Sequence, residues 1–194
     1  MDWGSIIESL FRGLIGESFI VFALAAIGLN LHFGYTGLLN FGQAVFMAAG
    51  AYGLAMMVAT IGPAANRNFG WDLSESTLFW LGIFVGVVVF PVVFALIMGI
   101  PTLRLRADYL AIVTIAVAEI FRIVVRSPTP SIKKWTNSSD GLTGFSGTFY
   151  DMSPFSTQDR YLFNLFTGNQ MFLVIVGWGV LAIGATICWL LIRS

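Results

Sequence analysis

Few side chains in this sequence could carry chemistry, and the most informative pair lies inside an apolar run. Glu119 and Arg122 are three residues apart within residues 109–125. An ionisable group inside a membrane span is costly, and by default it suggests a function. Residues three apart share one face of a helix, so the two side chains can pair. We therefore predict an intramembrane ion pair of Glu119 and Arg122, and this pairing favours a structural role over a proton-coupled role for the carboxylate.

The second candidate is the uncharged, glycine-rich stretch 34–43, GYTGLLNFGQ, between two apolar runs. Ten residues are few for a loop that leaves a membrane and returns. An irregular backbone exposed to lipid would leave peptide groups unpaired, so such a stretch must be buried in protein or line a watery cavity. A broken or re-entrant element fits this requirement. A tight interfacial hairpin is the alternative, because glycine and asparagine also mark ordinary turns.

No catalytic or metal-binding pattern accompanies these candidates. The sequence contains one cysteine, Cys188, and one histidine, His32, which cannot build a metal site together. It has no phosphate-cradling glycine loop, no HExxH and no GxSxG motif. We therefore expect no catalytic residues, no cofactor and no enzymatic activity.

The composition indicates the medium in which these residues act. Hydrophobic residues make up 57% of the 194 residues and charged residues only 10%, whereas soluble domains carry roughly 25% charged residues. So few charges cannot coat a globule in water, so the expected partner is a lipid bilayer. The formal net charge of zero argues against a nucleic-acid partner.

Five apolar segments approach the roughly 20 residues that a membrane-crossing helix needs. They are residues 18–33, 43–61, 77–100, 109–125 and 171–192. We predict an all-α fold, a polytopic membrane helix bundle of about five spans with one broken or re-entrant element, in a single membrane domain over residues 1–194. Small residues four apart, such as Ala49 with Gly53 and Gly82 with Gly86, should let helices approach closely.

Two further segments lie outside these spans. Residues 1–17 hold apolar side chains at helical spacing from Trp3 to Leu14 together with Glu8 and Arg12, so we expect an interfacial amphipathic helix over 3–15. Residues 127–170 form the long extramembrane segment, with room for a short helix or hairpin. Residues 62–76 read as a short polar connection.

The orientation follows from lysines and arginines in short loops. One side carries Arg104, Arg106 and Arg193, and the other carries Arg12 and Arg67. This margin of three to two places the C-terminus in the cytoplasm. The segment 127–170 is then an extracytoplasmic loop.

Three blocks of sequence resemble one known family. They are NLHFGYTGLLNFGQAVFMAAGAY (30–52), LRLRADYLAIVTIAVAEIFRIVV (103–125) and TNSSDGLTGF (136–145). In this order and spacing they look like the permease subunits of ATP-binding-cassette (ABC) importers for branched-chain amino acids, with a closer likeness to the second of the two paired permeases. Ala107 stands where the family usually has glycine.

The resemblance implies a mechanism and partners. An extracytoplasmic solute-binding protein would deliver the solute, a second permease subunit would complete the path in the cell inner membrane, and cytoplasmic ATPase subunits would power the transport. The broken element suggests path-lining or gating roles, because solutes meet broken helices near the midplane. The translocation-path candidates on this basis are Gly34, Gly37, Asn40, Gly42 and Gln43.

The same resemblance leaves alternatives open. Family members have about twice as many spans, and the coupling segment that docks on the ATPase should follow the fifth span. We therefore expect this sequence to be a truncated or split permease, or one completed by a partner. The solute could be a branched-chain amino acid, urea or a short amide. A structural membrane scaffold or assembly partner without transport activity is the competing function.

Overall fold

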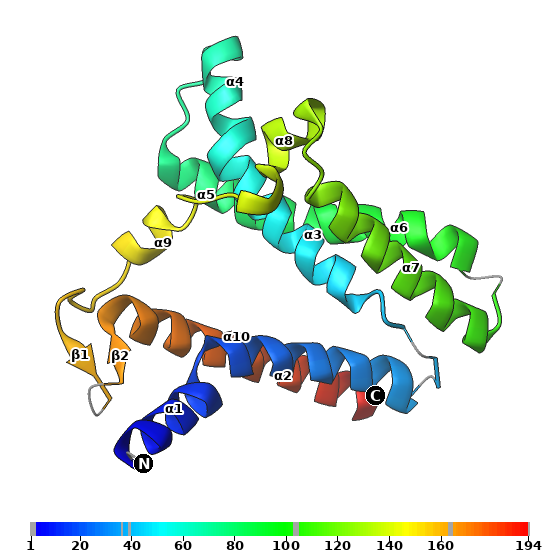
Figure 1. Ribbon diagram of the computed structural model, residues 1–194, viewed down its shortest axis with the longest axis horizontal. Coiled ribbons are helices and arrows are strands. Elements are labelled where there is room, and N and C mark those ends of the chain that lie inside the picture. Colours follow the sequence, from blue (N-terminus) through cyan, green and yellow to red (C-terminus); the bar gives the residue numbers. More distant parts are fainter. Residues whose placement is uncertain (1–2, 36, 39, 103–104, 163–164, 194) are drawn as a thin grey trace. The chain divides into compact units, whose positions relative to one another are not determined.

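A computed structural model describes residues 3–35, 37–38, 40–102, 105–162 and 165–193 (Figure 1). These residues form two compact units, one from residues 1–36 and 150–194 and one from residues 37–149. The first unit contains α1 (Trp3–Ile15), α2 (Glu17–Asn30), the π-helix η1 (Leu31–Tyr35), β1 (Arg160–Tyr161), β2 (Phe166–Thr167) and α10 (Gly168–Arg193). The second contains α3 (Gln43–Met56), η2 (Met57–Ile61), α4 (Gly62–Phe69), α5 (Glu75–Phe84), η3 (Val85–Val89), α6 (Phe90–Thr102), α7 (Ala107–Val125), α8 (Pro130–Thr136) and η4 (Ser138–Asp140). The short helix α9 (Gly147–Asp151) crosses the boundary between the two units.

The expected all-α membrane architecture is confirmed. Four continuous helices are long and apolar enough to cross a bilayer, and they cover Glu17–Tyr35, Gln43–Phe69, Glu75–Ile100 and Gly168–Arg193. The fifth expected span forms α7, a helix of 19 residues. Its sequence carries three charges, at Asp108, Glu119 and Arg122, and α7 does not rank with the four apolar helices. Within the described ranges, the only strands are the two-residue partners β1 and β2.

The connection expected at 62–76 is shorter than predicted, because α4 extends the second apolar helix to Phe69. Gly70 ends it in the left-handed conformation, with φ of 65°, and its amide donates to the Asn66 carbonyl. The Asn66 side chain then closes the loop: its amide donates to the Leu73 carbonyl at 2.9 Å, and its Oδ1 accepts from the Leu73 amide at 3.2 Å. Polar residues at 66–68 suggested a loop, but here they form a helix end that is capped by its own side chain.

Two π turns precede prolines at matching positions in the second unit. Each turn has five residues, η2 and η3, followed by one residue and then Pro63 or Pro91. The amide before each proline, at Gly62 and Phe90, donates to a carbonyl five residues earlier. Proline lacks an amide hydrogen, and its ring clashes with the carbonyl four residues earlier. The wider π turn lets both helices continue through a residue that normally interrupts them.

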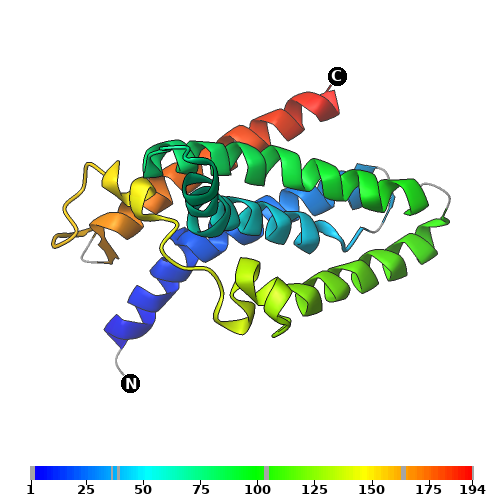
Figure 2. The ribbon, with the colours of Figure 1, turned by 90° about the horizontal axis from the view of Figure 1, so that it is seen from above.

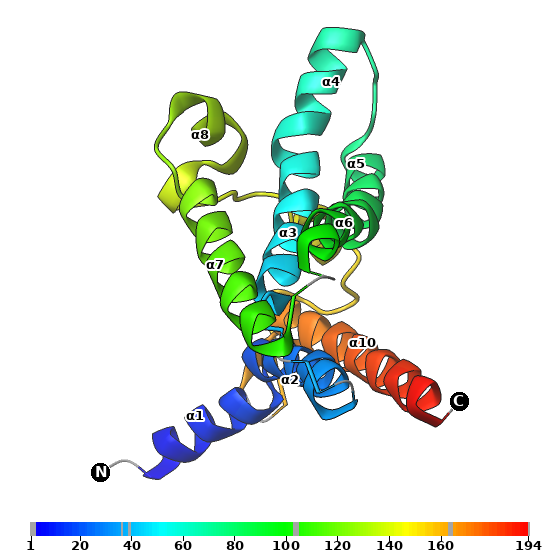
Figure 3. The same ribbon diagram turned by 90° about the vertical axis from the view of Figure 1, so that its right-hand side faces the viewer.

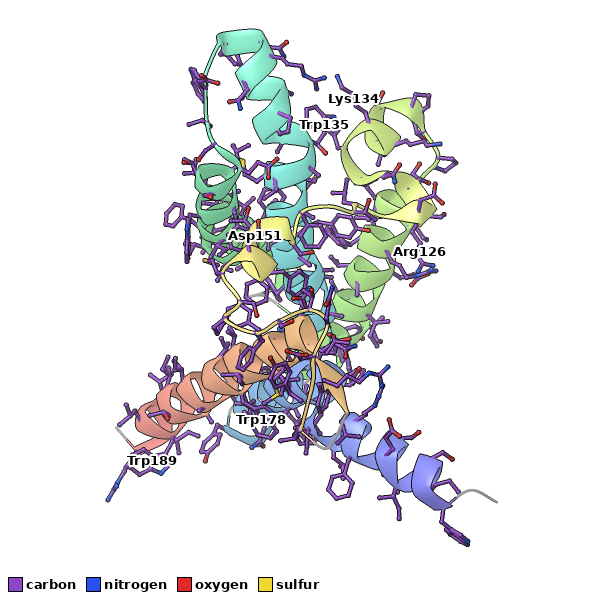
Figure 4. The ribbon with its side chains drawn as sticks, turned by 90° about the vertical axis from the view of Figure 1, so that its left-hand side faces the viewer. Arg126, Lys134, Trp135, Asp151, Trp178 and Trp189 are labelled. Atoms are coloured by element: carbon purple, nitrogen blue, oxygen red, sulfur yellow. The ribbon has the colours of Figure 1, made fainter. Side chains whose placement is uncertain are left out.

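In the first unit, α2 and α10 run side by side (Figure 1). Gly177 allows this approach, because a Cβ added there would lie 2.9 Å from the Ile20 side chain. The core beside this contact, at the start of both helices, is a cluster of Leu165, Phe166 and Val174. Figure 4 labels Trp178 and Trp189 on α10, with Trp189 toward the C-terminal end.

In the second unit, α3 packs against η3 and α6. The smallest residues lie at this contact: a Cβ added to Gly53 would be 2.7 Å from the Gly86 Cα, and Ala49 is fully buried. The close approach predicted from these small residues is therefore confirmed. Figure 2 shows that α6 and α7 run in opposite directions, as expected for neighbouring spans joined by a short link. Arg104 in that link, which was counted for the orientation, lies outside the described residues.

Candidate functional site

The glycine-rich break ends in a turn that is fixed by side chains. Asn40 Oδ1 accepts a hydrogen bond from the Gly42 amide at 2.9 Å. The Phe41 amide donates to Thr114 Oγ1 at 3.1 Å, across 73 residues of sequence. The Thr114 hydroxyl in turn donates to the Ala111 carbonyl, and Thr114 is only 2% exposed. Irregular backbone is thus paired with a buried side chain of α7, as such a segment requires in a membrane.

Two glycines of the break are required for different structural reasons, one for its backbone conformation and one for close packing. Gly37 has a φ of +67°, a left-handed conformation that favours glycine. Gly42 is buried, and a Cβ added there would lie 3.0 Å from Met98 Cε and 3.4 Å from Thr114 Cβ. Gly42 therefore allows the chain to enter α3 in close contact with α6 and α7.

Thr114 lies near the middle of α7, so the break contacts this helix far from its ends. Thr114 is the eighth of the 19 residues of α7. At 1.5 Å of rise per residue, it lies about 3 Å from the helix midpoint. The break therefore meets α7 near its middle, far from either helix end. Within this unit, the contact favours the broken element over an interfacial hairpin.

A cleft of about 690 Å³ lies between α3 and α7. Figure 3 shows the two helices close together at their starts and spread apart toward α8. Small and aliphatic side chains form much of the wall, and charged residues of α7 join them on the other side. The lining residues are Ala44, Val45, Ala48 and Tyr52 of α3, Ile115, Ala118, Glu119, Phe121, Arg122 and Val125 of α7, and Arg126.

The charged residues of the cleft follow one another along α7. Arg122 Nε donates to Glu119 Oε2 at 2.9 Å, and the two side chains are about half exposed. Arg126 lies one turn further on and is also exposed. Among the residues that the structure describes, its guanidinium makes no ion pair or hydrogen bond. The cleft thus carries one carboxylate and two guanidinium groups.

Aromatic side chains connect the two helices that line the cleft. Phe121 meets Tyr52 edge-on, with ring centroids 6.4 Å apart, and it meets Phe94 of α6 at 5.2 Å. Edge-to-face pairs at these separations are favourable. Tyr52 also lines a second, smaller cleft of about 220 Å³ with Gly141, Leu142 and Phe145. The cluster connects α3, α6, α7 and the segment after α8.

The segment 136–145 also caps α7. Ser138 Oγ donates to the Arg126 carbonyl at 2.9 Å, and the Asn137 side chain donates to the Gly141 carbonyl at 2.7 Å. Asn137 and Ser138 both have positive φ, 57° and 56°. Parts of the three resembling blocks therefore meet in the second unit, through α3, α7 and this cap. Figure 4 labels Arg126 at this end of α7 and Lys134 on the neighbouring helix α8.

The path candidates chosen from the sequence lie in two different units of the structure. Asn40, Gly42 and Gln43 lie together at the start of α3, and Gly37 belongs to the same unit. Gly34 lies in η1 of the other unit, where the side chain of Asn30 packs over it. Thr36 and Leu39 of the same stretch lie outside the described residues.

Sequence reasoning missed the partners of the break. Thr114 has no distinguishing signal in an apolar helix, because a single threonine can bond its own backbone there. Tyr52 belonged to a resembling block but carried no assigned role.

Known proteins are similar to this chain. A family model described as branched-chain amino acid transport system / permease component matches residues 13–194. The chain belongs to this permease family. The high-affinity branched-chain amino acid transport system permease protein LivM of Salmonella typhimurium is 36% identical over 111 residues, which are 57% of this chain and 22% of the relative. The LivM protein of Escherichia coli K12 is 35% identical over the same length. No solved structure matches the permease chain.

Family membership and the four apolar helices make this a multi-pass protein of the inner membrane. The matched region spans about a fifth of the length of the two LivM relatives. The family assignment covers nearly the whole permease chain, from Gly13 onward. It includes the break, the cleft and the cap described above.

Proposed function

We propose that this chain is a membrane permease subunit, or part of one, of an ABC importer, and that it forms part of the path for branched-chain amino acids. Two LivM relatives are named as high-affinity branched-chain amino acid permeases. The chain itself supplies no ATPase motif, so a separate cytoplasmic subunit hydrolyses ATP. A second permease subunit and an extracytoplasmic solute-binding protein complete the importer.

The observation that carries this proposal is the hydrogen bond from the Phe41 amide to Thr114. It supports a broken element whose irregular backbone lies near the middle of α7. Transporters commonly place solute contacts at such breaks, where backbone groups line a cavity. The cleft starts at Ala44, directly after the break, and continues to Arg126 at the end of α7. This arrangement provides a continuous lining from one helix end to mid-depth.

The path-lining residues in this proposal are those of the break. Gly42 lies against Met98 of α6 and Thr114 of α7, Asn40 and Gln43 lie next to it in sequence, and Gly37 precedes them in the same unit. Gly34 is proposed as a path residue at the end of the preceding span. Glu119 and Arg122 form the intramembrane pair beside the path.

The helix α1 is proposed to lie in the membrane surface. Its apolar side chains are exposed, and on its polar side Arg12 pairs with Glu8 at 2.8 Å. An amphipathic helix of this kind places its apolar face at the boundary of headgroups and acyl chains. The loop 127–170 then lies outside the membrane, and the structure forms two short helices, a 3₁₀ turn and a two-stranded hairpin within it.

The proposal is tested by uptake of labelled leucine into proteoliposomes that contain this chain, the second permease, the ATPase and the binding protein. Uptake should require ATP and all four components. A set without ATP-dependent uptake of leucine, isoleucine or valine contradicts the proposal. If labelled urea or acetamide is taken up instead, the permease role stands and the solute assignment is wrong.

Cysteine substitution tests the path itself. The single natural cysteine, Cys188, is first replaced by alanine. Gln43→Cys and Ala44→Cys should then react with a charged, water-soluble thiol reagent, and leucine should slow the reaction. Ile97→Cys on α6 is the matched control, since Ile97 is 62% exposed and lies on an uncharged, apolar helix. Unreactive cysteines at both path positions would exclude the path.

A further inference from the structure

The cleft between α3 and α7 presents two kinds of surface to a small molecule. Its aliphatic wall comes from Ala44, Val45 and Ala48, and its charged side comes from Glu119, Arg122 and Arg126. A branched-chain amino acid has the same two parts, an aliphatic side chain and a zwitterionic head. Its head requires an anion for the ammonium group and a cation for the carboxylate.

The cleft carries one more positive charge than negative charge. Glu119 and Arg122 neutralise each other through their hydrogen bonds. Arg126 adds a second cation that has no ion-pair or hydrogen-bond partner among the described residues. Guanidinium groups bind carboxylates well because their donors match the two oxygens. The Arg126 side chain is therefore available for an anionic group that enters the cleft.

The spacing allows one zwitterion to connect these groups. Glu119 and Arg126 are seven residues apart on one helix face, about 10 Å along the axis. Two long side chains and the head of an amino acid can cover that distance. Arg122 lies between them on the helix, so the ammonium group would lie at Glu119 and the carboxylate toward Arg126.

We infer that this cleft is a solute-contact site in which Glu119 binds the ammonium group and Arg126 the carboxylate of an aliphatic amino acid. The inference rests on the proposed function and names the residues that would recognise the solute. Arg122 positions the Glu119 carboxylate through its two hydrogen bonds. The aliphatic wall of α3 takes up the side chain of the solute, and Tyr52 closes that wall.

An anionic lipid headgroup is the competing occupant of the same cations. A phosphate would bind Arg122 and Arg126, and the Glu119 carboxylate would repel it. The two occupants therefore respond oppositely to loss of the carboxylate. Glu119→Gln should weaken binding of a zwitterion and strengthen binding of an anion.

The test measures direct binding of labelled leucine to the complete permease and ATPase complex in nanodiscs of zwitterionic lipid, without the binding protein. Glu119→Gln and Arg126→Gln should each weaken leucine binding at least tenfold in complexes that assemble as the wild type does. Lys133→Gln is the matched control, since Lys133 is an exposed cation of α8 outside the cleft. It should stay within twofold of the wild type.

A charge exchange separates recognition from a merely structural pair. The double variant Glu119→Arg with Arg122→Glu keeps an ion pair, but the new carboxylate lies one turn from Arg126 and neutralises it. The complex should assemble and still fail to bind leucine. Restored leucine binding in this variant would show that only the ion pair matters, and the inference would be wrong.

Analogues identify which group binds where. Leucinamide lacks the carboxylate, and 4-methylpentanoate lacks the ammonium group. The wild type should bind leucine more tightly than either analogue. The Arg126→Gln variant should no longer distinguish leucine from leucinamide, and the Glu119→Gln variant should no longer distinguish leucine from 4-methylpentanoate. If the wild-type complex transports leucine with the binding protein but never binds it directly, this inference fails and the proposed function stands. A complex that binds leucine but does not transport it would support the binding site and contradict the proposed importer function.

Discussion

The backbone amide of Phe41 donates a hydrogen bond to the side-chain hydroxyl of Thr114, which is buried in α7. This single contact joins the glycine-rich break to the middle of another helix. It also explains why α7 holds a buried polar group in an apolar environment. The hydroxyl accepts from one segment and donates to its own helix, so neither group is left unpaired.

Replacing Thr114 by valine keeps the shape of the side chain and removes its hydroxyl. The Phe41 amide then has no acceptor in a partly buried site, which costs about 1–3 kcal/mol. We expect a lower unfolding midpoint in detergent and weaker leucine uptake by the reconstituted importer. Thr114→Ser retains the hydroxyl and should keep uptake near the wild-type level. Equal stability of the valine variant and the wild type would contradict the importance of this bond.

The helices of this fold could be predicted because their apolar runs are long. The boundaries of α1 match the predicted residues 3–15, and α2 with η1 extends the expected 18–33 by one residue at the start and two at the end. The predicted end of the second apolar helix was wrong, because α4 continues this helix through Asn66 and Arg67. Composition indicated a loop there, but the Asn66 side chain stabilises the turn after the helix.

The arrangement of the site could be predicted only in part. Glycine-rich sequence indicated a break, and the three-residue spacing of Glu119 and Arg122 indicated their pairing. The partner of the break could not be predicted, because Thr114 is 73 residues away from Phe41 in sequence. Local patterns determine which residues share a helix face, whereas the pairing of distant helices depends on packing of the whole unit.

The contact between α3 and η3 should tolerate no added methyl group. A Cβ at Gly86 would lie 2.6 Å from the Gly50 carbonyl oxygen and 2.6 Å from the Leu54 nitrogen, both backbone atoms that cannot move aside. We expect Gly86→Ala to destabilise the protein by about 1–3 kcal/mol. The measurement is the thermal unfolding midpoint of the purified protein. Gly179→Ala is the control, because a Cβ there meets nothing within 4 Å; an equal loss in both variants would contradict the packing explanation.

The cap on α7 should depend on one of two adjacent serines. Ser138 Oγ donates to the Arg126 carbonyl, whereas the neighbouring Ser139 is exposed and makes no side-chain hydrogen bond within the described chain. Ser138→Ala should cost about 1 kcal/mol for the lost hydrogen bond. Ser139→Ala should leave the unfolding free energy unchanged. Hydrogen exchange in the last turn of α7 should rise only in the first variant, and a matching rise in both would exclude the cap.

The attachment of α1 should depend on Trp178 of α10. Its indole Nε1 donates to the Ile15 carbonyl at 3.0 Å, at the last residue of α1, and its ring stacks on Phe19 with centroids 5.7 Å apart. Trp178→Phe keeps an aromatic ring and removes the donor, so it should cost about 1 kcal/mol. Trp178→Leu removes the stacking as well, which adds about 0.5–1.5 kcal/mol.

Limited proteolysis near Gly16 reports this attachment directly. Cleavage should be slow in the wild type, faster in Trp178→Phe and fastest in Trp178→Leu, because each step loosens the joint between α1 and α2. Trp189→Phe provides the control, since Trp189 is 53% exposed and its ring lies beside the Arg193 guanidinium, near the end of α10. Its cleavage rate should equal that of the wild type. If Trp178→Phe is cleaved no faster than this control, the hydrogen bond to Ile15 does not hold α1 in place.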